Sequence, residues 1–266
     1  MQPSKKAIRD LIWKHYDASP NHTIEPARIA RELALTVGEI SAELQKMIDE
    51  GWIQGAIPQD VQEIPQEDHP SLILAIFASP RSLDRLLVDK EDKVITECIR
   101  LSKNRDHMQL TKQQAATVDD MSRALLDAAF QIIHIAGHGA DTGVILEDEH
   151  GGDFVVPQAA LAKMFSRYVP PRGRLECVIL NACYSLTTGA LTSSLGVPYT
   201  IAMEGPIGDQ AAIEFSRGFY DAIGAGMGIT FAYEEGCDRV ALKGLDGHFK
   251  AKLLCRDEVN VASNTN

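Results

Sequence analysis

Two short apolar runs stand out along the chain, because each ends at a potentially reactive side chain. Residues 131–136 lead into Gly137-His138-Gly139, and residues 178–182 lead into Cys183. Continuous apolar runs of this length are typical of strands buried at the centre of a parallel sheet. Ligands bind at the carboxyl ends of such strands, so the pattern predicts that His138 and Cys183 share a site.

The pattern around these runs predicts alternating strands and helices over residues 71–256. Strands are expected at 71–78, 108–110, 131–136, 176–181, 199–203 and 251–255, with a hairpin formed by 143–146 and 154–156. Helices are expected at 83–101, at 118–129 with a cap near Thr117, from Pro157 to Phe165, from Ser185, and near 207–223 and 228–236. This order predicts an α/β fold with a mostly parallel central sheet.

The first 56 residues have a different pattern and predict a separate small domain. Helical spacing covers residues 4–17, a second helix begins at Pro26, and a third extends from Thr36 to just before Gly51, followed by an extended piece at 52–55. This succession resembles a winged helix, so we expect an adaptor domain at 1–56. Residues 57–70 are expected to form a linker, and 257–266 a disordered tail.

A winged helix suggests DNA, but its charges argue against that partner. The basic residues of 1–58 are seven: Lys5, Lys6, Arg9, Lys14, Arg28, Arg31 and Lys46. The acidic ones are eight: Asp10, Asp17, Glu25, Glu32, Glu39, Glu43, Asp49 and Glu50. The predicted third helix is the most acidic part and would repel phosphate, so we expect protein contact or self-association. A packing module without a partner of its own is the alternative.

Composition supports a protein that binds neither nucleic acid nor membrane. Of 266 residues, 45% are hydrophobic and 24% charged, and the net charge is −11. No run approaches the length of a membrane span. The five cysteines are odd in number and have no CxxC spacing, which predicts neither a disulfide framework nor a zinc ribbon. We therefore expect a cytoplasmic protein with free thiols and no cofactor.

Several sequence blocks, in one order, resemble the CHAT domain, a caspase-like family related to metacaspases and separase. The blocks are 133–139, 143–148, 178–185, 201–212 and 215–220. The resemblance implies a caspase-like three-layer sandwich and endopeptidase activity, with His138 and Cys183 as the catalytic dyad. Small CHAT proteins with a short N-terminal adaptor resemble effectors of bacterial conflict or antiviral defence systems, which implies an activating protein partner and a protein substrate.

A cysteine protease needs a thiolate, which a neighbouring imidazole promotes, and donors for the oxyanion. The resemblance implies that the backbone N–H groups of Gly139 and Cys183 are those donors. The alternative is a buried structural cysteine and a capping histidine. His134 could suggest a zinc site with His138 and Cys183, but it lies inside an apolar run without a fourth ligand, so a core histidine is favoured and no metal is expected.

Substrate preference depends on the loop after the strand at 199–203. It carries Glu204 and Asp209 and no basic residue, and an acidic pocket would pair with Lys or Arg at P1 of the substrate. In separase-like relatives an aspartate matching Asp209 receives the basic P1 side chain. Alternatively, Asp209 only starts a helix, where carboxylates are favoured locally. The polar turn at 147–153 is either a regulatory or self-cleaved segment or only a hairpin tip.

Two other functions stay open at this point. The chain could be a non-catalytic, caspase-like adaptor, although such a module has no need of both His138 and Cys183. It could also be a DNA-binding regulator that uses its winged helix, which the acidic third helix disfavours.

Overall fold

The structure is a computed structural model that describes residues 5–18, 29, 40, 43–44, 46–48, 50–53 and 70–256. The chain divides into two compact units, Met1–His69 and Pro70–Asn266. Of the predicted linker only Pro70 is described, and the predicted tail at 257–266 lies outside the described residues. Each unit is considered by itself.

The N-terminal unit contains helix α1 (Lys5–Ala18), which the sequence predicts over 4–17. Its apolar side chains form one small cluster of buried residues: Ile12, Ile29, Ile40, Leu44, Met47 and Ile53. The rest of the predicted second and third helices is described only at scattered residues, so the winged helix stays a prediction. Trp52 and Ile53, predicted to be extended, form a bend because both backbone N–H groups donate to the carbonyl of Met47.

One acidic residue of the predicted third helix does not face outward. Glu43 is only 6% exposed and accepts a hydrogen bond from Arg9 Nε. The same guanidinium donates to Glu50 at 2.9 Å. Glu43 is therefore not available to repel a DNA phosphate, and Arg9 is not free to bind one, because two carboxylates already hold its guanidinium.

The C-terminal unit is built on a six-stranded sheet, which confirms the predicted α/β fold with a mostly parallel sheet. The strands are β1 (Ser71–Phe77), β2 (Met108–Gln114), β3 (Ile132–Ala136), β7 (Cys177–Asn181), β8 (Tyr199–Met203) and β9 (Ala251–Cys255). Their order is β2-β1-β3-β7-β8-β9, and only β9 is antiparallel to its neighbour.

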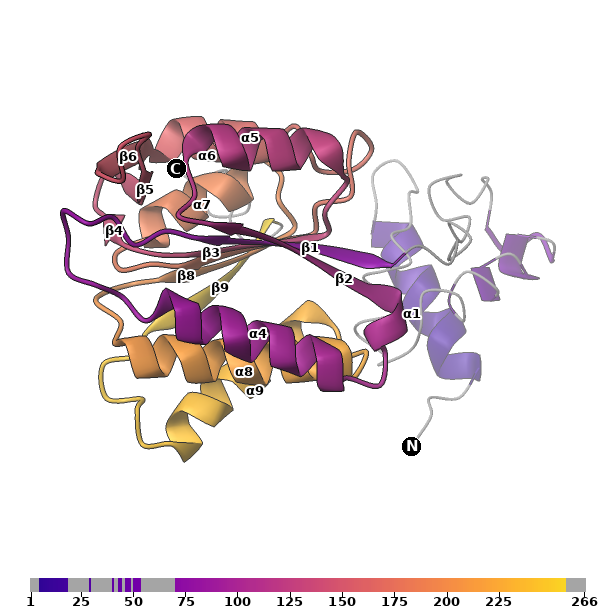
Figure 1. The fold of residues 1–266 in the computed structure, drawn as a ribbon. Coiled ribbons are helices and arrows are strands. Elements are labelled where there is room, and N and C mark those ends of the chain that lie inside the picture. Colours follow the sequence, from indigo (N-terminus) through magenta and orange to yellow (C-terminus); the bar gives the residue numbers. More distant parts are fainter. Residues whose placement is uncertain are drawn as a thin grey trace. The chain divides into compact units, whose positions relative to one another are not determined.

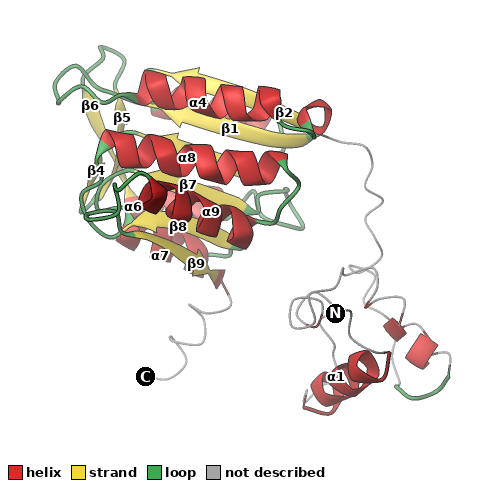
Figure 2. Cartoon of the chain, turned by 90° about the horizontal axis from the view of Figure 1, so that it is seen from below, coloured by secondary structure: helices red, strands yellow, loops and turns green. Residues whose placement is uncertain are grey.

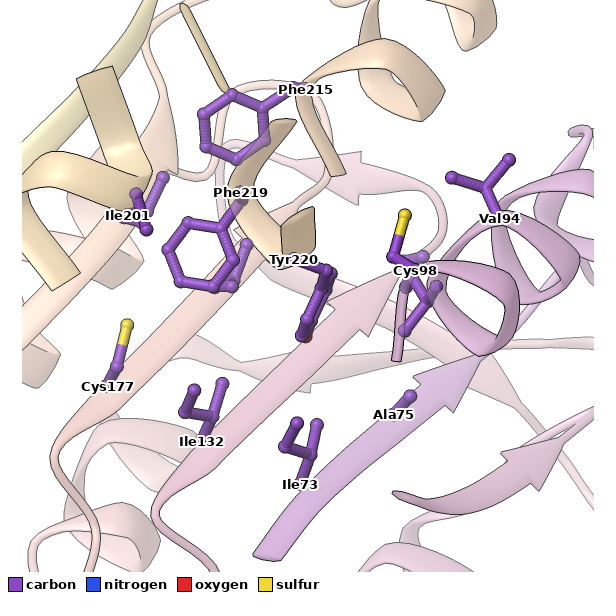
Figure 3. Close-up of a cluster of buried hydrophobic side chains, with 14 of the residues drawn as sticks. Ile73, Ala75, Val94, Cys98, Ile132, Cys177, Ile201, Phe215, Phe219 and Tyr220 are labelled. Carbon is purple, nitrogen blue, oxygen red and sulfur yellow. The ribbon is translucent and has the colours of Figure 1, made fainter. Parts of the chain in front are cut away.

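Helices cover both faces of this sheet, which explains why its central strands are apolar along their whole length. Helices α4 (Val88–Leu101), α8 (Asp209–Gly224) and α9 (Ile229–Leu242) lie on one face (Figures 1 and 2). Helices α5 (Val118–Asp127), α6 (Gln158–Phe165) and α7 (Leu186–Ser194) lie on the other (Figure 1). A short 3₁₀ turn (Arg105–His107) precedes β2. Figure 3 shows the aromatic side chains of α8 packed between the strands and α4.

A second, antiparallel sheet contains the predicted hairpin. It consists of β4 (Gly139–Ala140), β5 (Gly143–Glu147) and β6 (Asp153–Pro157). The two-residue strand β4 was not predicted. The turn at 147–153 is tight, with Asp148 Oδ1 accepting from the backbone N–H of His150 and Gly152 at 2.8 and 2.7 Å. Its role as a regulatory segment stays a prediction.

The helix predicted from residue 83 begins later, at Val88, because the preceding segment is held by the hairpin. Arg81 N–H donates to the carbonyl of Gly151 at 3.0 Å, and Ser82 Oγ to Asp153 at 2.7 Å. Residues 78–87 therefore form a loop, hereafter the β1–α4 loop. None of the described helices is long and apolar enough to cross a membrane.

Candidate functional site

Strands β3 and β7 bring the ends of the two apolar runs together. The strands are adjacent and parallel, with Ala136 paired to Asn181, so His138 and Cys183 each follow that pair by two residues. A Cβ atom placed on Gly139 would lie 1.9 Å from the carbonyl oxygen of Cys183. The two turns are therefore in backbone contact, and a glycine is required at this position.

The turn after β7 projects Cys183 from the sheet. Tyr184 has a φ of 54°, a left-handed conformation that is uncommon for residues other than glycine. The buried hydroxyl of Ser185 donates to the carbonyl of Leu180 and accepts from Met203 N–H, both at 3.0 Å. Cys183 itself is partly exposed, and its Sγ accepts a hydrogen bond from Ile207 N–H at 3.3 Å.

The β1–α4 loop fixes the orientation of His138. The ring Nε2 lies 2.7 Å from the backbone carbonyl of Asp84. A carbonyl oxygen can only accept, so Nε2 carries a proton, and the neutral ring keeps Nδ1 as its proton acceptor. Sequence reasoning missed this partner, because it placed Asp84 in a helix.

Three of the other cysteines have environments that suppress reactivity. Burial, followed by the nearby Asp221, raises the pKa of the Cys98 thiol to about 12. Burial also raises the pKa of Cys177, which is completely enclosed, and the pKa of Cys237. The thiolate is the reactive form, so these side chains behave as small hydrophobic groups, as the sequence predicts.

The two predicted substrate-binding residues lie in different places. Asp209 begins α8, is half-buried, and its Oδ2 accepts from Leu87 N–H of the β1–α4 loop at 3.1 Å. Glu204 is on the exposed loop after β8, with its carboxylate 3.9 Å from Lys252 Nζ. The structure brings Asp209, but not Glu204, to the cavity beside Cys183.

His134 is a fully buried residue that belongs to a polar network, not to the dyad. Its Nε2 lies 3.0 Å from Glu91 of α4, and its Nδ1 lies 3.3 Å from the hydroxyl of Tyr220 of α8. Within the described part of the chain, no group of three or more His, Cys, Asp or Glu side chains could hold a metal ion. The burial of Glu91 could have been predicted from the sequence, because Glu91 lies on the apolar stripe of its helix, three and four residues before Val94 and Ile95.

A small cavity of about 30 Å³ connects these groups. Its lining residues are Leu86, Leu87, Val88, Glu91, Gly137, His138, Asn181, Cys183, Ile207, Asp209, Ala212 and Ile213. A cavity of this volume has room for about two water molecules. The dyad candidates, the β1–α4 loop and the start of α8 thus surround one space.

A sheet of this order with a histidine and a cysteine at adjacent strand ends is characteristic of a caspase-like protein. The family model of the CHAT domain matches residues 54–236, well over half of the sequence, and the chain belongs to this family. No curated protein matches it significantly.

Among solved structures, the fold is similar to that of a secreted C11 cysteine protease from Bacteroides thetaiotaomicron in complex with an irreversible peptide inhibitor. The TM-score is 0.52 at 14% identity, covering 74% of this chain and 69% of that one. At this identity the similarity establishes the fold. Together with the CHAT family, it favours a caspase-like peptidase as the class of function.

Proposed function

We propose that the chain is a cysteine endopeptidase in which Cys183 is the nucleophile and His138 the general base. The observation that carries the proposal is the backbone contact between Gly139 and Cys183, since it puts the two side chains at one cavity. Membership of the CHAT family and the caspase-like fold support the same reaction.

The hydrogen bond from His138 Nε2 to the carbonyl of Asp84 supports Nδ1 as the ring nitrogen that acts as the base. Nδ1 accepts the proton of the Cys183 thiol, and the sulfur attacks the scissile carbonyl carbon. Nδ1–H then protonates the leaving amine, and water hydrolyses the thioester to release the acid. The Asp84 carbonyl stabilises the imidazolium that exists between the two transfers.

The oxyanion formed in each step requires donors in fixed positions. The backbone N–H groups of Gly139 and Cys183 are the proposed pair, because their turns are in contact and held by neighbouring strands. Asp209 is the proposed contact for a basic P1 side chain. Glu204 is proposed to meet the substrate outside the cavity, on the exposed loop.

The N-terminal unit is proposed to receive an activating protein partner or a second copy of the chain. Its ion pairs support a protein contact over DNA, because Arg9 is already bound to Glu43 and Glu50. A role as an effector in bacterial defence fits a peptidase controlled by such an adaptor and is part of the same proposal.

Peptide hydrolysis by two matched cysteine variants tests the assignment of Cys183 as the nucleophile. Cys183→Ala is expected to abolish hydrolysis of a peptide library, read by mass spectrometry, while keeping the wild-type unfolding temperature. Cys237→Ala is the control, and we expect it to keep cleaving because that thiol is not at the cavity. Cleavage by Cys183→Ala at the wild-type rate would rule out this nucleophile.

A further inference from the structure

A buried carboxylate lies beneath the proposed dyad, between the sheet and helices α4 and α8. Glu91 is only 4% exposed, yet its Oε1 accepts from Asn181 Nδ2 and from Ser216 Oγ, each at 2.6 Å. His134 Nε2 approaches the same oxygen at 3.0 Å.

The tautomer of His134 leaves this carboxylate without a counter-charge. Tyr220 is fully buried, and its hydroxyl hydrogen needs an acceptor. His134 Nδ1, at 3.3 Å, fills that role only when it carries no proton. The proton is then on Nε2, the ring is neutral, and it donates to Glu91. The network formed by Glu91, His134, Asn181, Ser216 and Tyr220 therefore carries one net negative charge.

The network opens onto the cavity beside Cys183. Glu91, Asn181 and Asp209 line it, and no lysine or arginine is among its described lining residues. Asn181 is 4% exposed, and its Oδ1 is buried without a hydrogen-bond partner among the described residues. Its Nδ2 is already turned toward Glu91 and the carbonyl of Ala212, so the unsatisfied atom is an acceptor.

The polar part of the cavity thus offers acceptors and negative charge, and its walls are aliphatic. Leu86, Leu87, Val88, Ile207 and Ile213 supply those walls. A lysine or arginine side chain has the matching chemistry, because its methylene stem packs on apolar surface and its head group only donates.

We propose that Glu91 is the charge that selects a basic P1 side chain, with Asn181 Oδ1 as an acceptor for one of its N–H groups. The proposal rests on the proposed peptidase function, and it adds Glu91 to Asp209 as a second determinant of the P1 preference. Glu91 acts more strongly than Asp209, because a buried charge is less screened by solvent. Asp209, in addition, already accepts from Leu87 N–H.

The first test compares labelling rates of Cys183 with peptidyl acyloxymethyl ketones that carry P1 arginine or its neutral isostere citrulline. Wild-type protein is expected to favour arginine by about 100-fold or more. Glu91→Gln, which keeps the side-chain shape, is expected to lower that ratio at least tenfold. Asp209→Asn is the matched comparison, with a smaller loss. An unchanged ratio in a folded Glu91→Gln protein would overturn the proposal, as would equal losses for both ketones.

The second test needs neither a variant nor peptidase activity. Butylguanidine and its neutral isostere butylurea are each added while iodoacetamide alkylates Cys183 in the full-length wild-type chain. We expect butylguanidine to protect the thiol at least tenfold better. Equal protection, or none by either compound, refutes the charge selection. If butylguanidine protects but no peptidyl ketone labels Cys183, the cation site stands and the peptidase proposal fails.

Discussion

Replacing Gly139 with alanine tests whether the two strand ends must touch for the site to work. The new Cβ would lie 1.9 Å from the carbonyl oxygen of Cys183, whereas real Cβ contacts essentially never fall below 3.0 Å. The turn must therefore move by 3.0 − 1.9 = 1.1 Å or more, and no flexible side chain can absorb the shift because the obstacle is backbone. Overpacking of this kind costs about 1–3 kcal/mol of unfolding free energy. A displacement of about 1 Å at a catalytic base lowers kcat by about 100-fold.

Gly205→Ala is the matched control, because a Cβ on Gly205 meets nothing within 4 Å and its φ is not positive. Both variants are unfolded in urea, and both are assayed for peptide hydrolysis under identical conditions. We expect Gly139→Ala to lose stability and activity, and Gly205→Ala to keep its stability within about 0.5 kcal/mol. Wild-type stability and kcat in Gly139→Ala would refute the contact between the two turns.

Three further changes probe how the site and the fold are held. Ser185→Ala removes a buried hydroxyl and leaves Met203 N–H unsatisfied, so urea unfolding should show a loss of about 2–3 kcal/mol; a loss below 0.5 kcal/mol would contradict this. Tyr184→Gly relieves a left-handed φ of 54° and should unfold at the same or a higher temperature than wild type, and a lower one would argue against strain. Thr117→Ala breaks a capping box and should cost about 1 kcal/mol at pH 7. Hydrogen bonds from Thr117 lower the pKa of the Asp120 carboxyl below 3.8. Asp120 therefore stabilises the fold above that pH, and this contribution disappears as the pH falls through its folded pKa. An equal cost of Thr117→Ala at pH 7 and pH 2 would contradict the role of the capping box.

The sequence by itself determined the central sheet and the positions of the two side chains proposed as the dyad. Continuous apolar runs identify buried parallel strands, because helices on both faces remove the need for polar alternation. Parallel strands end at one edge of the sheet, so His138 and Cys183 had to approach each other once β3 and β7 paired. Local capping signals such as Thr117 were equally readable, since they depend on neighbouring residues only.

Only the tertiary structure decided the groups that surround this pair. Helical spacing places Asp84 and Leu87 in a helix, but bonds to the hairpin, some 70 residues away, hold them in a loop, where Asp84 meets His138 and Leu87 meets Asp209. Glu91 can be recognised in the sequence as a charged residue on the apolar stripe of its helix. Its buried position, however, depends on hydrogen-bond donors from β3, β7 and α8, which lie far away in the sequence. Contacts between distant segments carry no local periodicity, and a pattern of hydrophobic and polar positions therefore could not supply them.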